Sequence, residues 1–176
     1  MSEAVIGLGS NQGDKNQNLL RALQAVSRLP GVKITGISSI YESTAVDVPD
    51  GAPVGTPAGV TEQEPFHNMC VKVDALMSPM ALLGACLGIE AAIGRVRKER
   101  SFTRLIDLDL LLYEGVKSES FEMSLPHPRM LQRSFVLLPL KELYPSGRAP
   151  GIFFDPYIKD AQPKGVVRLE KRIAMD

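Results

Sequence analysis

The sequence has 176 residues, 44% of them hydrophobic and 23% charged, which is the length and composition of one globular domain rather than two. Its 20 basic and 20 acidic residues give a formal net charge of zero, which excludes the general attraction to nucleic acid or anionic membranes that a strongly basic chain has. The two cysteines lie in apolar surroundings, and neither a signal peptide nor an apolar run of roughly 18 residues is present, so we expect a cytoplasmic protein without a membrane span.

The first half of the chain predicts alternating strands and helices. Residues 4–8 are apolar and stop at Gly9, and leucines then recur at helical spacing over residues 19–29. Residues 33–45 have the composition of one long strand and residues 66–73 of another, with a loop rich in proline and glycine at 48–64. Ser78 is an expected N-cap, and a second helix follows it as far as Gly94.

The second half predicts one more strand, which ends at Tyr113, and a third helix near residues 135–143. The resulting order, β-α-β-β-α-β, predicts an α+β fold of the ferredoxin-like type, with helices packed on one face of an antiparallel-containing sheet. We expect residues 1–145 to form a single domain. Residues 146–176 are weakly patterned and contain prolines, so we expect an extension that packs on this domain or is poorly ordered.

An acidic pair, Asp107 and Asp109, lies in the apolar segment of the last predicted strand. Residues i and i+2 of a strand point to the same face, so the two carboxylates would stand side by side, while Ile106, Leu108, Leu110 and Leu112 would face the core. Two such carboxylates repel each other and are costly to desolvate. A hard divalent cation such as Mg2+ would remove both penalties.

Five cations precede this pair within ten residues: Arg95, Arg97, Lys98, Arg100 and Arg104. A charged turn after a helix would ordinarily be a solvated surface. The neighbouring acidic pair changes that interpretation, because guanidinium groups bind phosphate oxygens in bidentate geometry and Mg2+ bridges carboxylates to substrate phosphates. The junction therefore predicts a site for a phosphorylated substrate.

The string GLGSNQG, residues 7–13, is similar to a dinucleotide-binding fingerprint but has Gln12 where the third glycine belongs, so we reject a Rossmann site. We interpret Gly7 and Gly9 as part of a strand-to-helix turn, with Asn11 or Asp14 as the helix cap.

Further candidates lie outside the acidic junction. His127 stands between two prolines and is either a phosphate donor or a turn histidine bound to backbone. Phe66 and Phe135 are either core residues or the two sides of a slot for a flat heteroaromatic ring, whose edge would bind the Asn68 amide.

Several separated motifs in this order give the chain a family resemblance. They are GLGSN, YESTAV, PFHN, GRVRKER, RLIDLDLLLYEG, LPHPRM and RSFVLLPL, and they extend to about Leu143. With them the sequence resembles the 6-hydroxymethyl-7,8-dihydropterin pyrophosphokinases of folate biosynthesis. The resemblance implies an ATP-dependent diphosphotransferase that transfers the β,γ-diphosphate of ATP to the hydroxymethyl group of the pterin and releases AMP.

The resemblance also implies roles for residues. Two Mg2+ ions would bind Asp107 and Asp109, with Arg95 and Arg104 also catalytic. ATP would be bound by Glu90, Arg97, Arg100, His127 and Arg133. The pterin would be bound by Ser43, Thr44, Ala45, Phe66, Asn68 and Phe135. No nucleic acid or membrane partner is implied, and we expect a monomer or weak homodimer.

The sequence departs from the family pattern in two places. Ser101-Phe102-Thr103 stands where the family usually has Trp-Gly-Pro, and the loop at 48–64 is longer, with Thr44-Ala45 where a proline pair is common. An alternative is therefore a nucleotide-binding relative that is non-catalytic or has a different substrate. An RNA-binding module is disfavoured by the neutral charge and the acidic pair.

Overall fold

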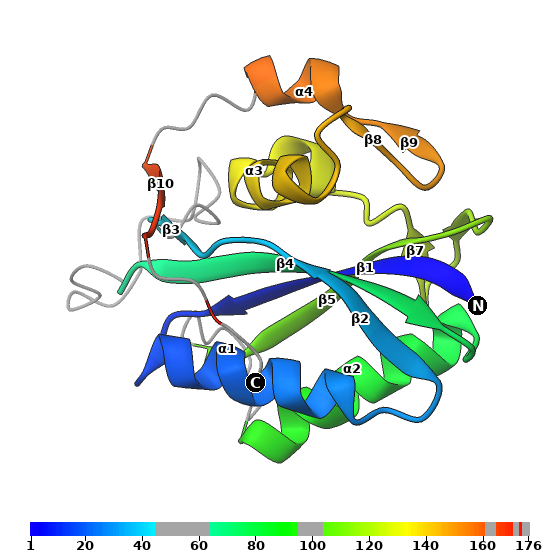
Figure 1. Cartoon of the computed structure of the whole chain (residues 1–176), viewed down its shortest axis with the longest axis horizontal. Coiled ribbons are helices and arrows are strands. Elements are labelled where there is room, and N and C mark those ends of the chain that lie inside the picture. Colours follow the sequence, from blue (N-terminus) through cyan, green and yellow to red (C-terminus); the bar gives the residue numbers. More distant parts are fainter. Residues whose placement is uncertain (45–63, 95–103, 161–164, 171–172, 174–176) are drawn as a thin grey trace.

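The computed structural model describes residues 1–44, 64–94, 104–160, 165–170 and 173, which are built around a six-stranded sheet (Figure 1). The strand order is β10-β3-β4-β1-β5, with β2 paired to β4 off this path, and every pairing is antiparallel. The expected combination of helices with an antiparallel sheet is therefore confirmed. Its strands are β1 (Ser2–Ser10), β2 (Val32–Ile37), β3 (Tyr41–Ser43), β4 (Phe66–Ala75), β5 (Asp107–Tyr113) and β10 (Val166–Arg168).

The remaining described elements are helices and two short hairpins. The helices are α1 (Lys15–Ser27), α2 (Pro79–Ile93), the 3-10 turn η1 (Met130–Gln132), α3 (Ser134–Leu143) and α4 (Asp155–Asp160). The hairpins pair β6 (Ser118–Glu119) with β7 (Ser124–Leu125), and β8 (Arg148–Ala149) with β9 (Ile152–Phe153). Among the described residues, no helix is both long and apolar enough to cross a membrane.

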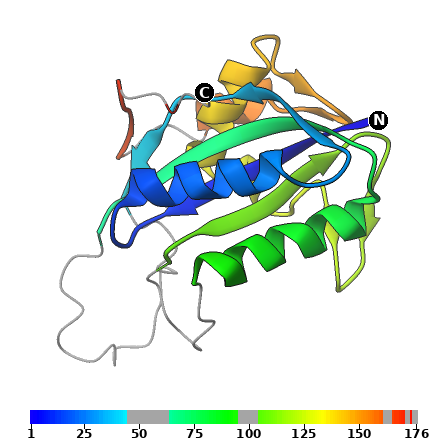
Figure 2. The same cartoon turned by 60° about the horizontal axis from the view of Figure 1, so that its bottom comes forward.

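Helices lie on both faces of the sheet, so the prediction that they all pack on one face is wrong (Figures 1 and 2). α1 and α2 cover one face, and α3 covers the other. The reason is that adjacent positions of β1 are buried in different cores. Ala4 and Ile6 pack with the leucines of α1 and α2, whereas Val5 packs with α3 residues such as Leu137.

Of the two residues predicted as possible caps of the first helix, Asp14 is the one that is used, and both predicted ends of the second helix are confirmed. Asp14 is the N-cap of α1, and its side chain accepts a hydrogen bond from the Gln17 backbone N–H at 3.0 Å. Ser78 caps α2 in the same way, and α2 ends at Gly94, whose φ of 104° is a left-handed conformation that favours glycine.

The segment predicted as one strand over residues 33–45 is two strands, β2 and β3, with a break after Ile37. The Ser39 N–H donates to Oε2 of Glu142 on α3 at 2.6 Å, and the Cys70 N–H donates to Oγ of Ser38 at 2.9 Å. These side-chain oxygens satisfy backbone donors outside the regular ladder, so the strand can break without leaving them unpaired.

A β-bulge lies in β5 at Leu111. Val5 pairs with Leu112 and Ile6 with Leu110, so Leu111 is the extra residue of the pair. Leu110 is buried beneath α1 and α2 as predicted, but Leu112 is buried with Leu111 in the core beneath α3. The prediction that Leu112 shares the face of Leu110 is wrong, because one extra residue reverses the faces that the following residues occupy.

Candidate active site

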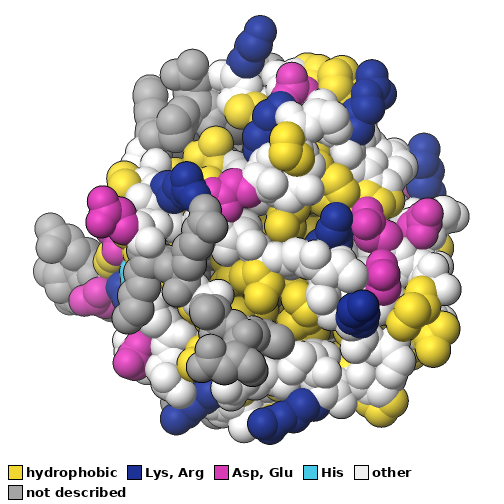
Figure 3. Space-filling view, viewed as in Figure 1, with side chains coloured by type: hydrophobic (Ala, Val, Ile, Leu, Met, Phe, Trp, Pro, Cys, Tyr) yellow, Lys and Arg dark blue, Asp and Glu magenta, His cyan; other side chains and the backbone are white. Residues whose placement is uncertain are grey.

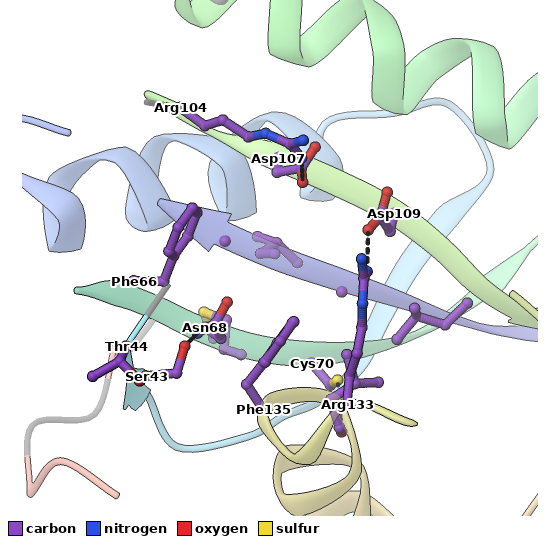
Figure 4. Close-up of a pocket in the computed structure, with 16 residues that line it drawn as sticks. Ser43, Thr44, Phe66, Asn68, Cys70, Arg104, Asp107, Asp109, Arg133 and Phe135 are labelled. Atoms are coloured by element: carbon purple, nitrogen blue, oxygen red, sulfur yellow. Dashed lines mark hydrogen bonds and ion pairs between the residues drawn. The ribbon is translucent and has the colours of Figure 1, made fainter. Parts of the chain in front are cut away.

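A pocket that is open to solvent lies on the α3 face of the sheet, where β1, β4 and β5 run side by side (Figure 4). Segments that are far apart in the sequence meet there, because β3 and the start of α3 complete the lining. The predicted site residues that line it are Ser43, Thr44, Phe66, Asn68, Arg104, Asp107, Asp109, Arg133 and Phe135.

Two glycines of β1, Gly7 and Gly9, form the floor of the pocket. A Cβ added at Gly9 would lie 3.1 Å from Oδ1 of Asn68, and one added at Gly7 would lie 3.2 Å from Cδ1 of Leu111. Because residues i and i+2 share a face of a strand, two missing side chains leave a hollow between the neighbouring strands. Their ladder neighbours are Cys70 and Asp109 for Gly7, and Asn68 and Asp107 for Gly9.

The interpretation of Gly7 and Gly9 as part of a strand-to-helix turn is wrong, since both lie inside β1, which continues to Ser10. The turn that follows is held by Asn11. Its N–H donates to the Arg104 carbonyl at 3.0 Å, and its Oδ1 accepts from the Arg104 N–H at 2.6 Å. Asn11 therefore attaches this turn to the segment just before β5.

Asp107 and Asp109 both line the pocket, as their spacing predicts, and their side chains are 17% and 39% exposed. Each has an arginine beside it. Nη1 of Arg104 contacts Oδ2 of Asp107, and Nη1 of Arg133, the residue that precedes α3, lies 3.8 Å from Oδ2 of Asp109 (Figure 4). The pocket therefore has carboxylates and guanidinium groups on the same side.

The charges in this group influence each other. Burial raises the pKa of Asp109, the negative charge of Asp107 raises it further, and the nearby His127 and Arg133 act in the opposite direction. Burial also lowers the pKa of His127. An added cation beside the carboxylates would favour their ionised forms.

The acidic pair fits Mg2+ better than a metal held by protein ligands alone. Within the part of the chain that the structure describes, no three or more His, Cys, Asp and Glu side chains are placed to hold a metal ion. Mg2+ is commonly bound by one or two carboxylates together with water and substrate phosphates, so two carboxylates in an open pocket suffice.

An aromatic slot occupies the other half of the pocket. Phe66 comes from β4 and Phe135 from the first turn of α3, and Asn68 lies between them in Figure 4. The guanidinium carbon of Arg133 lies 5.5 Å from the centre of the Phe135 ring, which is within cation–π range. The two rings and one amide suit a flat, polar-edged heterocycle.

The Asn68 amide is held in place by β3. Its Nδ2 donates to Oγ of Ser43 at 2.9 Å, and Ser43 is only 2% exposed. This hydrogen bond fixes the orientation of the Asn68 side chain. The amide also has an oxygen, Oδ1, and a second N–H with which it can bind a ligand. Thr44 also lines the pocket, whereas Ala45 lies outside the described residues.

Two predicted nucleotide-binding residues lie outside the lining. Glu90 is buried in α2 at 2% exposure, and its Oε1 accepts a hydrogen bond from the Leu108 N–H at 2.8 Å, so it joins α2 to β5. His127 is attached to β5 by its N–H, which donates to the Leu111 carbonyl at 2.8 Å. Their roles toward a nucleotide stay predictions. Arg95, Arg97, Arg100 and the segment 101–103 lie outside the described residues.

Seven residues that line the pocket were not predicted as site residues: Gly7, Leu8, Gly9, Met69, Cys70, Leu111 and Val136. A signal was present for Cys70, because it follows Asn68 by two residues on the same strand. The same spacing relates the two glycines to each other. Leu111 and Val136 had no such signal, since the bulge and the position of α3 are tertiary features.

Charged side chains of both signs are interspersed on the face shown in Figure 3 and do not gather into one basic area. This distribution agrees with the zero net charge of the chain. The positive groups of the pocket, Arg104 and Arg133, each lie beside one carboxylate of the acidic pair.

Comparison with known proteins gives a consistent result. Residues 5–145 match the family model of 7,8-dihydro-6-hydroxymethylpterin-pyrophosphokinase (HPPK). A 2-amino-4-hydroxy-6-hydroxymethyldihydropteridine pyrophosphokinase of Methylorubrum extorquens is 36% identical over 97% of this chain and 100% of its own length. One of Bacillus subtilis is 37% identical over 80% of this chain and 77% of its own.

Solved structures share the fold. An HPPK-DHPS in complex with substrates has a TM-score of 0.59 at 16% identity, over 93% of this chain and 44% of its own. A triple mutant of Plasmodium falciparum HPPK-DHPS with pteroate has a TM-score of 0.65 at 15% identity, over 95% and 46%. The chain thus spans less than half the length of these HPPK-DHPS chains.

Proposed function

The chain belongs to the 7,8-dihydro-6-hydroxymethylpterin-pyrophosphokinase family, and we propose that the glycine-floored pocket is where it transfers diphosphate from ATP to 6-hydroxymethyl-7,8-dihydropterin. The chain is an ATP-dependent pyrophosphokinase of folate biosynthesis, and AMP is the other product. One observation carries the assignment of the site. The acidic pair with its arginines and the aromatic slot with its amide line the same pocket, so a phosphate donor and a flat acceptor would lie next to each other.

The pterin would lie between Phe66 and Phe135. Stacking on two aromatic rings adds specificity to the burial of a flat heterocycle. Asn68 would bind the ring edge, because Ser43 accepts from one amide N–H and the amide has an oxygen and a second N–H with which to bind a ligand. Ser43, Thr44 and Ala45 would also contact the ring edge, and we call them the edge-reading segment.

Asp107 and Asp109 would hold Mg2+, two ions by the family pattern, and the bound metal would neutralise charge on the triphosphate. Arg104 and Arg133 would bind phosphate oxygens from opposite sides of the acidic pair. The same role is proposed for Arg95, Arg97, Arg100 and His127, and Glu90 would contact the nucleotide or its loop.

The protein would catalyse the reaction mainly by aligning the two substrates and stabilising charge, and not by forming a covalent intermediate. The pterin hydroxyl oxygen attacks the β-phosphorus, and the bond from that phosphorus to the α–β bridging oxygen breaks, so that AMP leaves. The arginines stabilise the shifting negative charge, and the slot holds the hydroxyl in line. The hydroxyl proton would pass to Asp109 or to water.

We also propose a fold type, domain limits, a cellular location and an oligomeric state for the protein. The β1-α1-β2-β4-α2-β5 succession and the central order β4-β1-β5 support a ferredoxin-like core. Residues 1–145 would be the catalytic domain and 146–176 an extension of it, acting in the cytoplasm as a monomer or weak homodimer.

AMP formation tests the function. Purified protein is incubated with ATP and 6-hydroxymethyl-7,8-dihydropterin, with and without Mg2+, and AMP is measured. AMP release that requires both the pterin and Mg2+ is expected. ATP binding without AMP release, from folded protein, would instead favour a non-catalytic relative or one with another substrate.

A further inference from the structure

The C-terminal strand β10 extends the sheet beside β3 (Figure 1), and β3 carries Ser43 of the pocket lining. Val166 pairs with Ser43, and Arg168 pairs with Tyr41. The N–H of Thr44 donates to the Gly165 carbonyl at 3.3 Å. Both described residues of the edge-reading segment, Ser43 and Thr44, are therefore neighbours of this strand, which lies beyond the matched residues 5–145.

The Arg168 side chain joins β10 to α3. Its Nε lies 2.9 Å from Oε1 of Glu142, and its Nε and Nη2 donate to Oγ of Ser39 at 3.0 and 2.9 Å. The same carboxylate accepts from the Ser39 N–H at 2.6 Å and from the Tyr41 hydroxyl at 3.1 Å. Burial, with the charge of Glu142 as the next cause, raises the pKa of Tyr41 to about 12, so this hydroxyl stays a donor.

These contacts connect the two sides of the aromatic slot. Glu142 lies in the last turn of α3, whose first turn carries Phe135, while Ser39 and Tyr41 lead into Ser43 at the end of β3. β3 has only three residues and is held by β4 on one side and β10 on the other. So short a strand has little stability of its own, and its position depends on these neighbours.

We propose that Arg168 is a positioning residue for pterin binding, which fixes Ser43 and Thr44 relative to Phe135 through Ser39 and Glu142. This rests on the proposed use of the slot for the pterin. Gly165 has a related role, since its φ is +81° and an added Cβ would lie 2.9 Å from Oγ1 of Thr44. A side chain there would displace Thr44.

The test compares Arg168→Gln with Lys141→Gln. Lys141 contacts Asp155, so its variant removes an ion pair between α3 and another part of the same extension, away from β3. Arg168 is half exposed, so we expect its variant to raise KM for the pterin about threefold, with KM for ATP and kcat unchanged. Lys141→Gln should change neither KM nor kcat. Arg168→Lys should have a KM for the pterin between those of the wild type and Arg168→Gln.

A second measurement does not need turnover. Pterin fluorescence is titrated with each variant in the presence of an ATP analogue that cannot be cleaved between its α- and β-phosphates. The Kd of the pterin should rise for Arg168→Gln and also for Gly165→Ala. Equal changes for pterin and ATP, or the same effect from Lys141→Gln, would overturn the positioning role.

Failure of this inference is distinct from failure of the proposed function. If the wild type binds the pterin but forms no AMP, the reaction is wrong, and the titration still decides the role of Arg168. If the wild type does not bind the pterin, both are overturned.

Discussion

Arg133, which directly precedes α3, places Nη1 3.8 Å from Oδ2 of Asp109 on β5. The same guanidinium lies over the Phe135 ring. One side chain thus borders both halves of the pocket, the acidic pair and the aromatic slot. If a pterin occupied the slot and a triphosphate lay at the acidic pair, Arg133 would lie where the two ligands meet.

Removal of one carboxylate should slow the reaction strongly without unfolding the protein. We expect Asp107→Asn to lower the rate of AMP formation about a hundredfold or more, because electrostatic stabilisation of the phosphates is the main catalytic contribution. Rates are measured over a series of Mg2+ concentrations. The exposed Glu119→Gln is the matched control and should behave as the wild type. Full activity of Asp107→Asn would remove Asp107 from the metal site.

Truncation of one ring should affect one substrate selectively. Phe135→Ala is expected to weaken pterin binding about tenfold, because it removes one stacking partner, and to leave ATP binding nearly unchanged. Calorimetric titrations with each ligand separate the two effects. Phe153→Ala, a partly exposed ring that packs on Arg148, is the control. An equal loss for both ligands would count against the slot.

A methyl group added to the pocket floor should hinder pterin binding. In Gly9→Ala the new Cβ would lie 3.1 Å from Oδ1 of Asn68 and 3.9 Å from Cδ1 of Phe66, so the amide must shift and the slot narrows. We expect KM for the pterin to rise about tenfold. Gly88→Ala in α2 is the matched control, because a Cβ there meets nothing within 4 Å. It should keep activity and raise the melting temperature.

His67 should make the fold sensitive to acid. Its Nδ1 lies 2.9 Å from Oδ1 of Asn16 and its Nε2 3.2 Å from Oε2 of Glu42, and burial lowers its pKa. The folded pKa is therefore below the unfolded value of about 6.5, and the unfolded state binds the proton first as pH falls. This contribution to stability is complete above about pH 6.5 and is lost below it.

Thermal melts at about pH 7.5 and about pH 5.5 check this sign. The melting temperature of the wild type should fall more between the two pH values than that of His67→Gln. Equal falls would show that other groups are responsible for the acid sensitivity, since both proteins share all remaining titratable residues.

Much of the secondary structure could be predicted, because its causes are local. Asp14 and Ser78 are caps by their own side chains, and the strand pleat alone puts Asp107 and Asp109 on one face. The expected strand at residues 33–45 was wrong for the opposite reason. The break after Ile37 depends on Glu142, which is more than 100 residues away from Ser39 in the chain.

By itself the sequence determined the family, the acidic pair with its arginines, and the residue types of the aromatic slot. Motifs can be recognised from neighbouring residues alone, and so can the rule that residues i and i+2 of a strand share a face. The tertiary structure alone decided that Gly7 and Gly9 form a floor, that α3 covers the other face, and that Arg133 meets Asp109. These features depend on strand register, on the bulge at Leu111 and on long-range packing. Such relationships are set by contacts between distant segments, and no local pattern encodes them.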